Sequence, residues 1–357
     1  VVPPARTQSK DGLPPSGTVK AILKAVDRFA PDLVHVWGTE NFWGLFTARS
    51  LIGSTALLEM QGLKRSISDV YNGGLSTSEQ IACIGVKELL RKNTIFQAKK
   101  QFKRWGAFER EMIANHNSIT VQSDWMEAQV RAHNHECCIY RTERVLRQPF
   151  YDSAPWRFSE NPVFFCSAAY SAPFKGLHVA VRALAIVKRH YPSVQLHIAG
   201  AHQINGLRRD GYIAWIANEV RRLGLQDNVK WLGTLTAVQI VEELQKCSAI
   251  LLPTFVESYC LALAEAMRLG VPAVVSYTGG TSFLSKDEET SLFFNAGDEA
   301  MCAHQLSRVL SDRKLSMRLS EKSRAIAFER NNPDKILSNQ LATYQHVMNQ
   351  RQLCCHV

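Results

Sequence analysis

The chain has 357 residues, of which 46% are hydrophobic and 21% charged, and this composition excludes a disordered or fibrous protein. Its length suggests about two domains, and the absence of any run of about 18 apolar residues excludes a transmembrane helix. The 42 basic and 32 acidic residues give a formal net charge of +10. Nine scattered cysteines without a CxxC spacing indicate free thiols in a reducing, cytoplasmic compartment, and we expect no metal site.

The first half of the chain alternates short apolar runs with helical patterns, which is typical of an α/β domain. Its predicted strands are 32–38, 54–61 and 118–123. Its predicted helices lie near 40–51, 83–92, 97–115 and 124–133. No strand, Gly-rich loop and helix precede residue 32, so we expect the N-terminal domain (1–151) to be truncated, with on the order of 60 residues missing.

Segment 87–110 concentrates positive charge, since it holds eight Lys or Arg residues against Glu88 and Glu109, a net +6. Aromatic residues Phe96, Trp105 and Phe108 are interleaved with these charges. A basic helix with aromatic anchors is typical of a surface that binds an anionic membrane. The alternative is a solvated helix whose aromatic residues face the core. We expect no nucleic-acid partner, because no recognised module accompanies the charge.

The second half repeats the alternation more clearly and predicts a second doubly wound parallel-sheet domain, at 162–333. Its predicted strands are 162–168, 194–199, 229–232, 248–252 and 272–276. Its predicted helices are 176–190, 210–223, 236–246, 260–269 and 298–311. The Ser- and Pro-bearing segment 152–161 is the predicted linker, and 334–357 is predicted to be a helix that crosses back to the first domain. Ligands of such sheets bind at the carboxyl ends of the strands, so we expect the two Rossmann-like domains to face a cleft.

The most informative stretch is 253–280, in which a buried strand is followed by a loop and a helix. Glu257 lies in the loop, and Glu265 lies eight residues later inside an apolar helix. A carboxylate in apolar surroundings needs a partner, and the two hydroxyls of a ribose would supply one. The backbone N–H groups of Ser258, Tyr259, Cys260 and Leu261 begin the helix and would suit a phosphate. The alternative is a core helix that tolerates one Glu.

This stretch resembles the Glu-x7-Glu motif of the retaining glycosyltransferases of family 4, which have the GT-B fold. The run EAMRLGVPAVV and the two glycines at 279–280 belong to the same resemblance. The segment that begins at Tyr170 and contains Lys175-Gly176 resembles the family's Lys-Gly segment, which implies that Lys175 binds the donor diphosphate. An exposed surface lysine is the alternative. The family usually has a basic residue shortly before this lysine, and here none is present.

The first half resembles a subset of the family that builds capsular or surface polysaccharides. The resemblance rests on the runs HVWGTE, EMQGL and ERVLRQPFY. It implies that His35 contacts an acceptor or sugar, although a core histidine is an equal alternative. The role of Arg147, near the predicted linker, is left open in the same way.

The resemblance therefore implies a metal-independent glycosyltransferase, and the roles of the carboxylates follow from it. Glu257 and Lys175 would be catalytic, with Glu257 on the sugar and Lys175 on the diphosphate, and Glu265 would bind the ribose. The donor would be UDP- or GDP-linked, no cofactor would be needed, and the acceptor would be a glycan or lipid-linked glycan. The enzyme would be cytoplasmic or peripheral at the inner membrane face. A nucleotide-sugar epimerase and a non-catalytic nucleotide-sugar-binding module are the alternatives.

Overall fold

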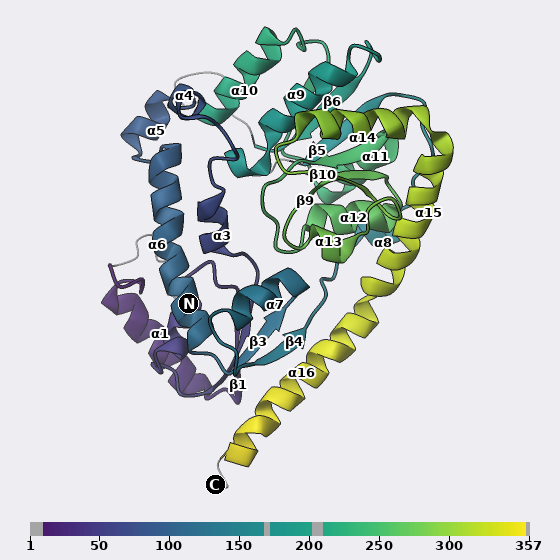
Figure 1. Cartoon of the computed structure of the whole chain (residues 1–357). Coiled ribbons are helices and arrows are strands. Elements are labelled where there is room, and N and C mark those ends of the chain that lie inside the picture. Colours follow the sequence, from purple (N-terminus) through teal and green to yellow (C-terminus); the bar gives the residue numbers. More distant parts are fainter. Residues whose placement is uncertain (1–9, 168–171, 202–209, 355–357) are drawn as a thin grey trace. The chain divides into compact units, whose positions relative to one another are not determined.

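The computed structural model describes residues 10–167, 172–201 and 210–354, which divide into two compact units (Figure 1). Unit 1 comprises Val1–Asp69, Lys100–Arg144 and Pro333–Val357. Unit 2 comprises Val70–Lys99 and Val145–Asn332.

Unit 1 is built on a parallel four-stranded sheet in the order β1-β2-β3-β4. The strands are β1 Leu33–Trp37, β2 Thr55–Glu59, β3 Ser118–Val121 and β4 Cys138–Arg141. All four residues of β3 are buried, because central parallel strands are covered on both faces. Helices α2, α6 and α7 contribute Phe46, Met112 and Met126 to the hydrophobic core beside Leu58 and Ile119.

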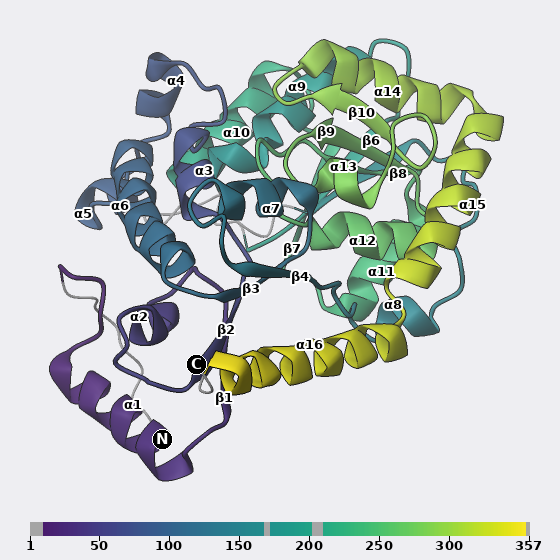
Figure 2. The same ribbon diagram turned by 60° about the horizontal axis from the view of Figure 1, so that its bottom comes forward.

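The helices of unit 1 connect the strands or cover the sheet. They are α1 Ser16–Phe29, α2 Trp43–Ala48, α3 Lys64–Asp69, most of α6 Ile95–Ala114, α7 Asp124–Arg131 and α16 Pro333–Cys354. The last helix, α16, packs against β2, and Figure 2 shows it running alongside the strands of this unit. The C-terminal helix expected at 334–357 therefore forms part of the unit that holds the first half of the chain.

Unit 2 contains a parallel six-stranded sheet in the order β10-β9-β8-β5-β6-β7. The strands are β5 Val163–Ser167, β6 Gln195–Ala199, β7 Val229–Gly233, β8 Ala249–Leu252, β9 Ala273–Tyr277 and β10 Leu292–Asn295. The chain runs outward in one direction from β5 to β7 and in the other from β8 to β10. The order therefore reverses between β5 and β8, which is where such sheets bind their ligands.

Helices cover this sheet and join its strands. They are α8 Pro149–Asp152, the 3-10 turn η1 Pro173–Lys175, α9 Leu177–Val187, α10 Gly211–Arg222, α11 Ala237–Lys246, α12 Leu261–Leu269, α13 Thr281–Leu284, α14 Glu299–Ser311 and α15 Arg313–Arg330. Two short helices from the first half of the chain also belong to unit 2, namely α4 Thr77–Ala82 and α5 Val86–Leu90. The fold class is thus the predicted one, α/β with two parallel sheets.

The division of the chain differs from the predicted domain boundaries. Residues 70–99 and 145–151 were assigned to the first domain, but they belong to unit 2. The predicted linker, 152–161, is anchored on unit 2, because Trp156 is buried there and its indole Nε1 donates to the carbonyl of Cys247 at 2.8 Å. The Ser and Pro residues of segment 152–161 indicate an irregular backbone, but they do not show whether a side chain of the segment, such as that of Trp156, is buried.

The basic segment 87–110 is not one helix, in agreement with the separate helices predicted near 83–92 and 97–115. It contains the end of α5, a turn at 91–94 and most of α6. The aromatic residues also differ in exposure. Phe108 packs against the core of unit 1 and Trp105 is half-buried, with the ammonium of Lys64 4.3 Å from the centroid of its ring. Of the three aromatic residues, Phe96 is the exposed one, at 44%.

Within the described ranges, no helix is long and apolar enough to span a membrane. The cysteines from Cys83 to Cys302 are free thiols, and all of them except Cys138 are buried.

Candidate functional site

The loops that follow β5, β8 and β9 lie at one edge of the unit 2 sheet, where the strand order reverses. Backbone hydrogen bonds tie the first two loops together, since the N–H of Phe255 donates to the carbonyl of Phe174 at 2.7 Å. The hydroxyl of Thr278, after β9, donates to the carbonyl of Phe255 at 2.8 Å. The predicted site residues in these loops are therefore held by a connected backbone.

Lys175 ends the turn η1 and is followed by Gly176, a position that only a glycine can occupy. Gly176 has a φ of 71° and lies against the end of β8, so that an added Cβ would meet the carbonyl oxygen of Pro253 at 1.7 Å. A side chain at residue 176 would push the two loops apart. The Lys-Gly pair thus has a physical basis, because the glycine lets the lysine approach the loop after β8. The segment from Tyr170 to Ser171 lies outside the described residues.

The structure brings Lys175 and Glu257 into direct contact, with 2.6 Å between Nζ and Oε1. Burial opposes the charge on the lysine, but the neighbouring carboxylate outweighs it and raises the pKa of Lys175 above its ordinary value. The ammonium therefore stays charged at neutral pH. It has three N–H donors, and among the described residues one of them is bonded to Glu257, which leaves donors for other oxygen atoms.

Two glycines after β9 shape the loop that carries Glu257. Gly279 has a φ of 51°, and an added Cβ would lie 1.9 Å from the carbonyl oxygen of Glu257. At Gly280 a Cβ would lie 2.1 Å from the carbonyl oxygen of Ser258, and the N–H of Gly280 donates to the carbonyl of Glu257 at 2.8 Å. These glycines let the two loops pack backbone against backbone, which fixes the position of Glu257.

Of the residues predicted to present backbone N–H groups, Leu261 begins α12, whereas Ser258 and Tyr259 lie in the loop before it. Cys260 precedes the helix with a φ of 74°, a conformation that non-glycine residues seldom adopt. Tyr259 is buried, and its hydroxyl accepts a hydrogen bond from Asn331 Nδ2 at 3.1 Å. The Tyr259 side chain is therefore committed to the interior, whereas Leu261 is 43% exposed and Ser258 is partly exposed.

Glu265 lies in the second turn of α12 with 3% of its surface exposed, and its partner in the structure is a guanidinium. Arg147 Nε and Nη2 each donate to one carboxylate oxygen at 2.7 Å. Burial raises the pKa of Glu265, and Arg147 acts in the opposite direction. The sequence showed that this carboxylate needs a partner, but no spacing connects residues 147 and 265.

His178, which the sequence analysis did not single out, fixes a loop from the first half of the chain beside the Lys175 turn. Burial, assisted by the charge on Arg182, lowers the pKa of His178 to about 4, so its ring is neutral. Its Nε2 lies 2.9 Å from the carbonyl of Gly73, and its Nδ1 lies 2.9 Å from the hydroxyl of Tyr212. A neutral ring satisfies both contacts if Nε2–H donates to Gly73 and Nδ1 accepts from Tyr212.

His35 belongs to unit 1 and lies in the middle of β1. Its Nδ1 is 2.7 Å from the hydroxyl of Tyr344 in α16, and its Nε2 is 3.1 Å from Glu59 Oε2. Arg144 Nη1 binds the other oxygen of Glu59 at 2.6 Å. Nδ1 of His35 is thus hydrogen-bonded inside unit 1, whereas its buried Nε2 lies close to Glu59 without a hydrogen bond to a described residue.

A hollow in unit 1 lies where the chain leaves β1, and it was not predicted. It is lined by polar and aromatic side chains that include Glu40, Asn41 and Trp105. Beneath its rim, the buried Glu109 accepts hydrogen bonds from Thr39 Oγ1 at 3.1 Å and from the backbone N–H of Lys64 at 3.1 Å. For metal ions, the described ranges hold no group of three His, Cys, Asp or Glu side chains close enough to share one.

Comparison with known families identifies the segment that contains this site. Residues 152–326 match the family described as glycosyl transferases group 1. The match covers slightly less than half of the chain. Lys175, Glu257 and Glu265 all lie within it, so the resemblance drawn from their motifs is confirmed at the level of group 1 glycosyltransferases.

Curated relatives match part of the chain. The chain is 29% identical over 191 residues to the uncharacterized glycosyltransferase YqgM of Bacillus subtilis, covering 54% of this chain and 51% of the relative. It is 26% identical over 156 residues to a D-inositol 3-phosphate glycosyltransferase of Salinispora arenicola, covering 43% of this chain and 34% of the relative. The chain thus spans about half, or less, of the length of these relatives.

Solved structures of glycosyltransferases share the fold over nearly the whole chain. HepE of Anabaena, solved with UDP and glucose, aligns with a TM-score of 0.69 at 16% identity, covering 92% of this chain and 82% of that one. Sucrose-phosphate synthase of Thermosynechococcus elongatus aligns with a TM-score of 0.68 at 17% identity, covering 95% and 78%. These neighbours have the GT-B fold, which confirms the predicted fold class.

Proposed function

We propose that this protein transfers a sugar from a nucleotide-sugar donor to a hydroxyl group of a glycan or lipid-linked glycan, with retention of configuration. The observation that carries the proposal is the Lys175–Glu257 pair, which lies at the reversal point of the sheet within a group 1 glycosyltransferase segment. The relatives named as glycosyltransferases and the neighbour solved with UDP and glucose support it.

The chemistry of glycosyl transfer requires two charges to be stabilised. As the bond to the anomeric carbon breaks, positive charge develops on the sugar and negative charge on the departing diphosphate. In our proposal Lys175 and the first N–H groups of α12 bind the diphosphate, since they are in place before the reaction begins. Glu257 binds the sugar hydroxyls and faces the charge that develops on the sugar.

We propose that Glu265 binds the ribose, with Arg147 holding its carboxylate. Each carboxylate oxygen has two lone pairs, so a hydroxyl can share the oxygen that Arg147 already binds. This arrangement would let a buried carboxylate stay ionised and accept both ribose hydroxyls.

The finer features of the proposal come from the family resemblance. They are a UDP- or GDP-linked donor, a reaction that needs no resident metal, and a role in polysaccharide or glycan biosynthesis at the inner face of the membrane. We propose that unit 1 provides the acceptor side.

Calorimetric titration of UDP, GDP, ADP and CMP into the protein tests the donor site. We expect one nucleotide to bind, and we expect Lys175→Ala and Glu265→Gln to weaken it. Transfer from the matching nucleotide-sugar to saccharide acceptors, with and without EDTA, then tests the reaction and its independence of metal. Binding without hydrolysis or transfer would favour a binding module, and epimer formation without acceptor would favour an epimerase. Unchanged affinity in both variants would refute the assigned donor site.

A further inference from the structure

The short helices α4 and α5 and the start of α6 expose an unusual number of large apolar side chains. These helices lie together at one end of α6 in both ribbon views (Figures 1 and 2). The exposed fractions are 57% for Ile81, 59% for Val86, 61% for Leu89, 81% for Leu90 and 44% for Phe96.

The pattern within α5 is amphipathic. Val86, Leu89 and Leu90 are spaced i, i+3 and i+4, so they share one face of the helix. Lys87 and Glu88 lie on the opposite face, and both are engaged within unit 2. Lys87 Nζ is 3.6 Å from Asp210 Oδ2, and Glu88 accepts from the backbone N–H groups of Gly85 and Gly211 at 3.1 and 3.2 Å.

The apolar face is therefore presented by an anchored element. Near α4, Arg182 binds Glu79 and Glu299, which ties that helix to α9 and α14. At the start of α10, Gly211 packs so closely that an added Cβ would meet the carbonyl oxygen of Cys83 at 2.0 Å. One side of the α4–α5 element is thus fixed to unit 2 by charge pairs and close packing, and the other side carries the leucines.

Basic residues flank the apolar face. Arg91 and Lys92 follow α5 directly and are exposed, and Lys99 lies one helical turn after Phe96 in sequence. None of these three makes an ion pair with another described residue. Segment 86–99 has four basic residues and one acidic residue. With Lys87 and Glu88 engaged within unit 2, the remaining cations are Arg91 and Lys92, which are exposed, and Lys99, which is partly exposed.

We propose that this surface, made of Ile81, Val86, Leu89, Leu90 and Phe96 with Arg91, Lys92 and Lys99, binds an anionic lipid membrane. The apolar side chains enter the boundary between headgroups and acyl chains, and the cations contact lipid phosphates. Exposed leucines beside unpaired cations complement an anionic bilayer, which offers both an apolar interior and a negative surface. This surface replaces the Trp105 and Phe108 anchors expected from the sequence, and the proposal does not depend on glycosyl transfer.

Co-sedimentation of the full chain with vesicles tests the proposal. We compare vesicles of phosphatidylcholine alone with vesicles that also contain phosphatidylglycerol. The wild type is expected to bind the anionic vesicles more tightly, and added salt should weaken this binding. The double variant Leu89→Asp/Leu90→Asp is expected to lose at least about tenfold in partitioning, because two apolar side chains no longer enter the lipid. Arg91→Gln/Lys92→Gln should lose the preference for anionic lipid and keep the weaker binding to neutral vesicles.

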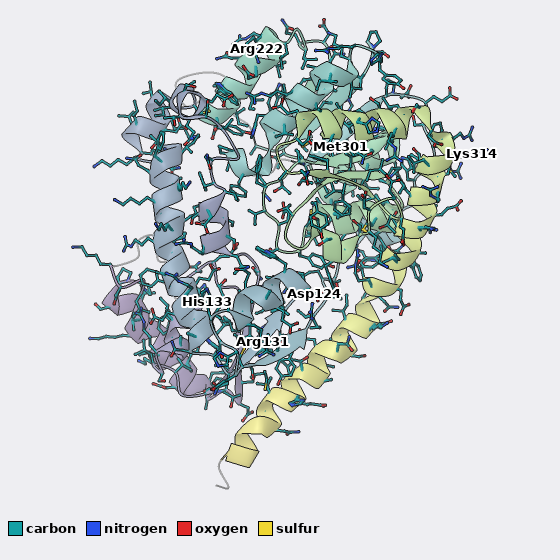
Figure 3. All side chains as sticks on the ribbon, viewed as in Figure 1. Asp124, Arg131, His133, Arg222, Met301 and Lys314 are labelled. Carbon is teal, nitrogen blue, oxygen red and sulfur yellow. The ribbon has the colours of Figure 1, made fainter. Side chains whose placement is uncertain are left out.

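Matched controls come from unit 2. Val238 in α11 is 54% exposed, so Val238→Asp adds an acidic residue at a comparably exposed apolar position elsewhere. Lys314→Gln removes an exposed cation at the start of α15 (Figure 3). Both controls should bind vesicles as the wild type does, and circular dichroism should show that all variants are folded.

Two results would overturn the proposal. One is equal vesicle binding by the wild type and the leucine variant, or no binding by either. The other is concentration-dependent self-association that the leucine substitutions abolish in the absence of lipid binding, which would make this face an interface between copies of the chain. Nucleotide titration of the same variants measures the proposed donor site separately, so a failure of the membrane proposal can be told apart from a failure of the donor-site proposal.

Discussion

Replacement of Arg147 by Met tests how the buried carboxylate of Glu265 is held. The substitution keeps most of the apolar stem of Arg147 but removes both 2.7 Å hydrogen bonds to a carboxylate that is 3% exposed. Removing one partner of a fully buried ion pair costs about 3–5 kcal/mol, because the other charge is left without compensation. The Arg147 side chain is 42% exposed, so water replaces part of the interaction. We therefore expect a loss of about 2 kcal/mol at pH 8, near the range for hydrogen bonds to charged groups.

The same substitution should make stability depend on pH in a defined direction. Burial already raises the pKa of Glu265 in the folded protein, and loss of Arg147 should raise it further. A carboxyl whose folded pKa lies above its unfolded pKa contributes stability below the unfolded pKa, and this is lost as the pH rises through the folded pKa. The deficit of Arg147→Met relative to the wild type should thus be smaller at pH 5 than at pH 8.

Urea unfolding of the wild type and variant at both pH values measures these effects. Arg222→Met is a matched control, because Arg222 also binds a buried glutamate, Glu219, with two hydrogen bonds, at 2.8 and 2.7 Å (Figure 3). The Arg222 side chain is more exposed, at 63%, and Glu219 keeps a second partner in Arg182, whose Nε lies 3.5 Å away. Because Glu219 is not left without a cation, this control should lose much less stability than Arg147→Met. Equal behaviour of the two arginine variants, or a larger Arg147 deficit at pH 5, would refute the reasoning.

Nucleotide affinity gives a second measurement on the same pair. If Arg147 keeps Glu265 ionised for the ribose, Arg147→Met should weaken binding about tenfold at neutral pH, which corresponds to one charge-assisted hydrogen bond. Adding Arg147→Met to Glu265→Gln should then have little further effect, because the two residues act through one contact. Tighter binding by Arg147→Met would instead mean that the arginine competes with the ribose.

Three further predictions concern the loops around the site. Lys175→Ala should lower the affinity for a nucleoside diphosphate by about 10- to 100-fold and that for the monophosphate less, as calorimetry would show; equal losses would contradict the assignment to the diphosphate. Burial lowers the pKa of His178 in the folded protein to about 4, so its contribution to stability is complete above about pH 6.5 and is lost as the pH falls through 4. His178→Asn should therefore remove up to about 3 kcal/mol of the acid dependence of unfolding, measured by urea titration. An unchanged pH profile would show that His178 is not the source of this acid dependence. Gly279→Ala should both destabilise the fold and reduce nucleotide binding, because the added Cβ would meet the carbonyl oxygen of Glu257. Gly224→Ala is the control: Gly224 has a φ of 65°, but no atom lies within 4 Å of its added Cβ, so this variant has the backbone strain alone. Equal effects of the two substitutions would contradict the close approach of Gly279 to Glu257.

The sequence predicted the parallel strands of both sheets well where they are apolar runs between turn residues. The strand expected at 248–252 is β8, Ala249–Leu252, and the one expected at 32–38 is β1, Leu33–Trp37. Strands β4 and β10 were not predicted. In β4, Cys138–Arg141, the burial is only intermediate or absent, so its residues do not form a continuous apolar run. The periodic signal that identifies a strand is correspondingly weak in β4. In β10, Leu292–Asn295, three of four residues are buried, so low burial does not account for its omission.

Local sequence also determined which residues gather at the candidate site. Lys175 and Glu257 follow β5 and β8, and the carboxyl ends of parallel strands meet at one edge of a sheet. That these two strands are adjacent, with the order reversing between them, follows from the pairing of Phe164 with Ala249, which no local pattern encodes. The spacing of residues along the chain predicts which loop carries a given residue. It does not predict which strands are neighbours in the sheet.

Tertiary structure alone decided the partners of the buried polar groups. The burial of Glu265 could be inferred from its apolar helix, yet its partner Arg147 comes from 118 residues earlier in the chain. The same holds for His178, which fixes Gly73 from 105 residues away. A buried charge or imidazole requires a partner wherever one can reach it, and the chain position of that partner is set by the packing of whole elements. The sequence by itself therefore determined the fold class and the candidate residues, whereas the folded chain determined which of them are paired, which are buried and which face solvent.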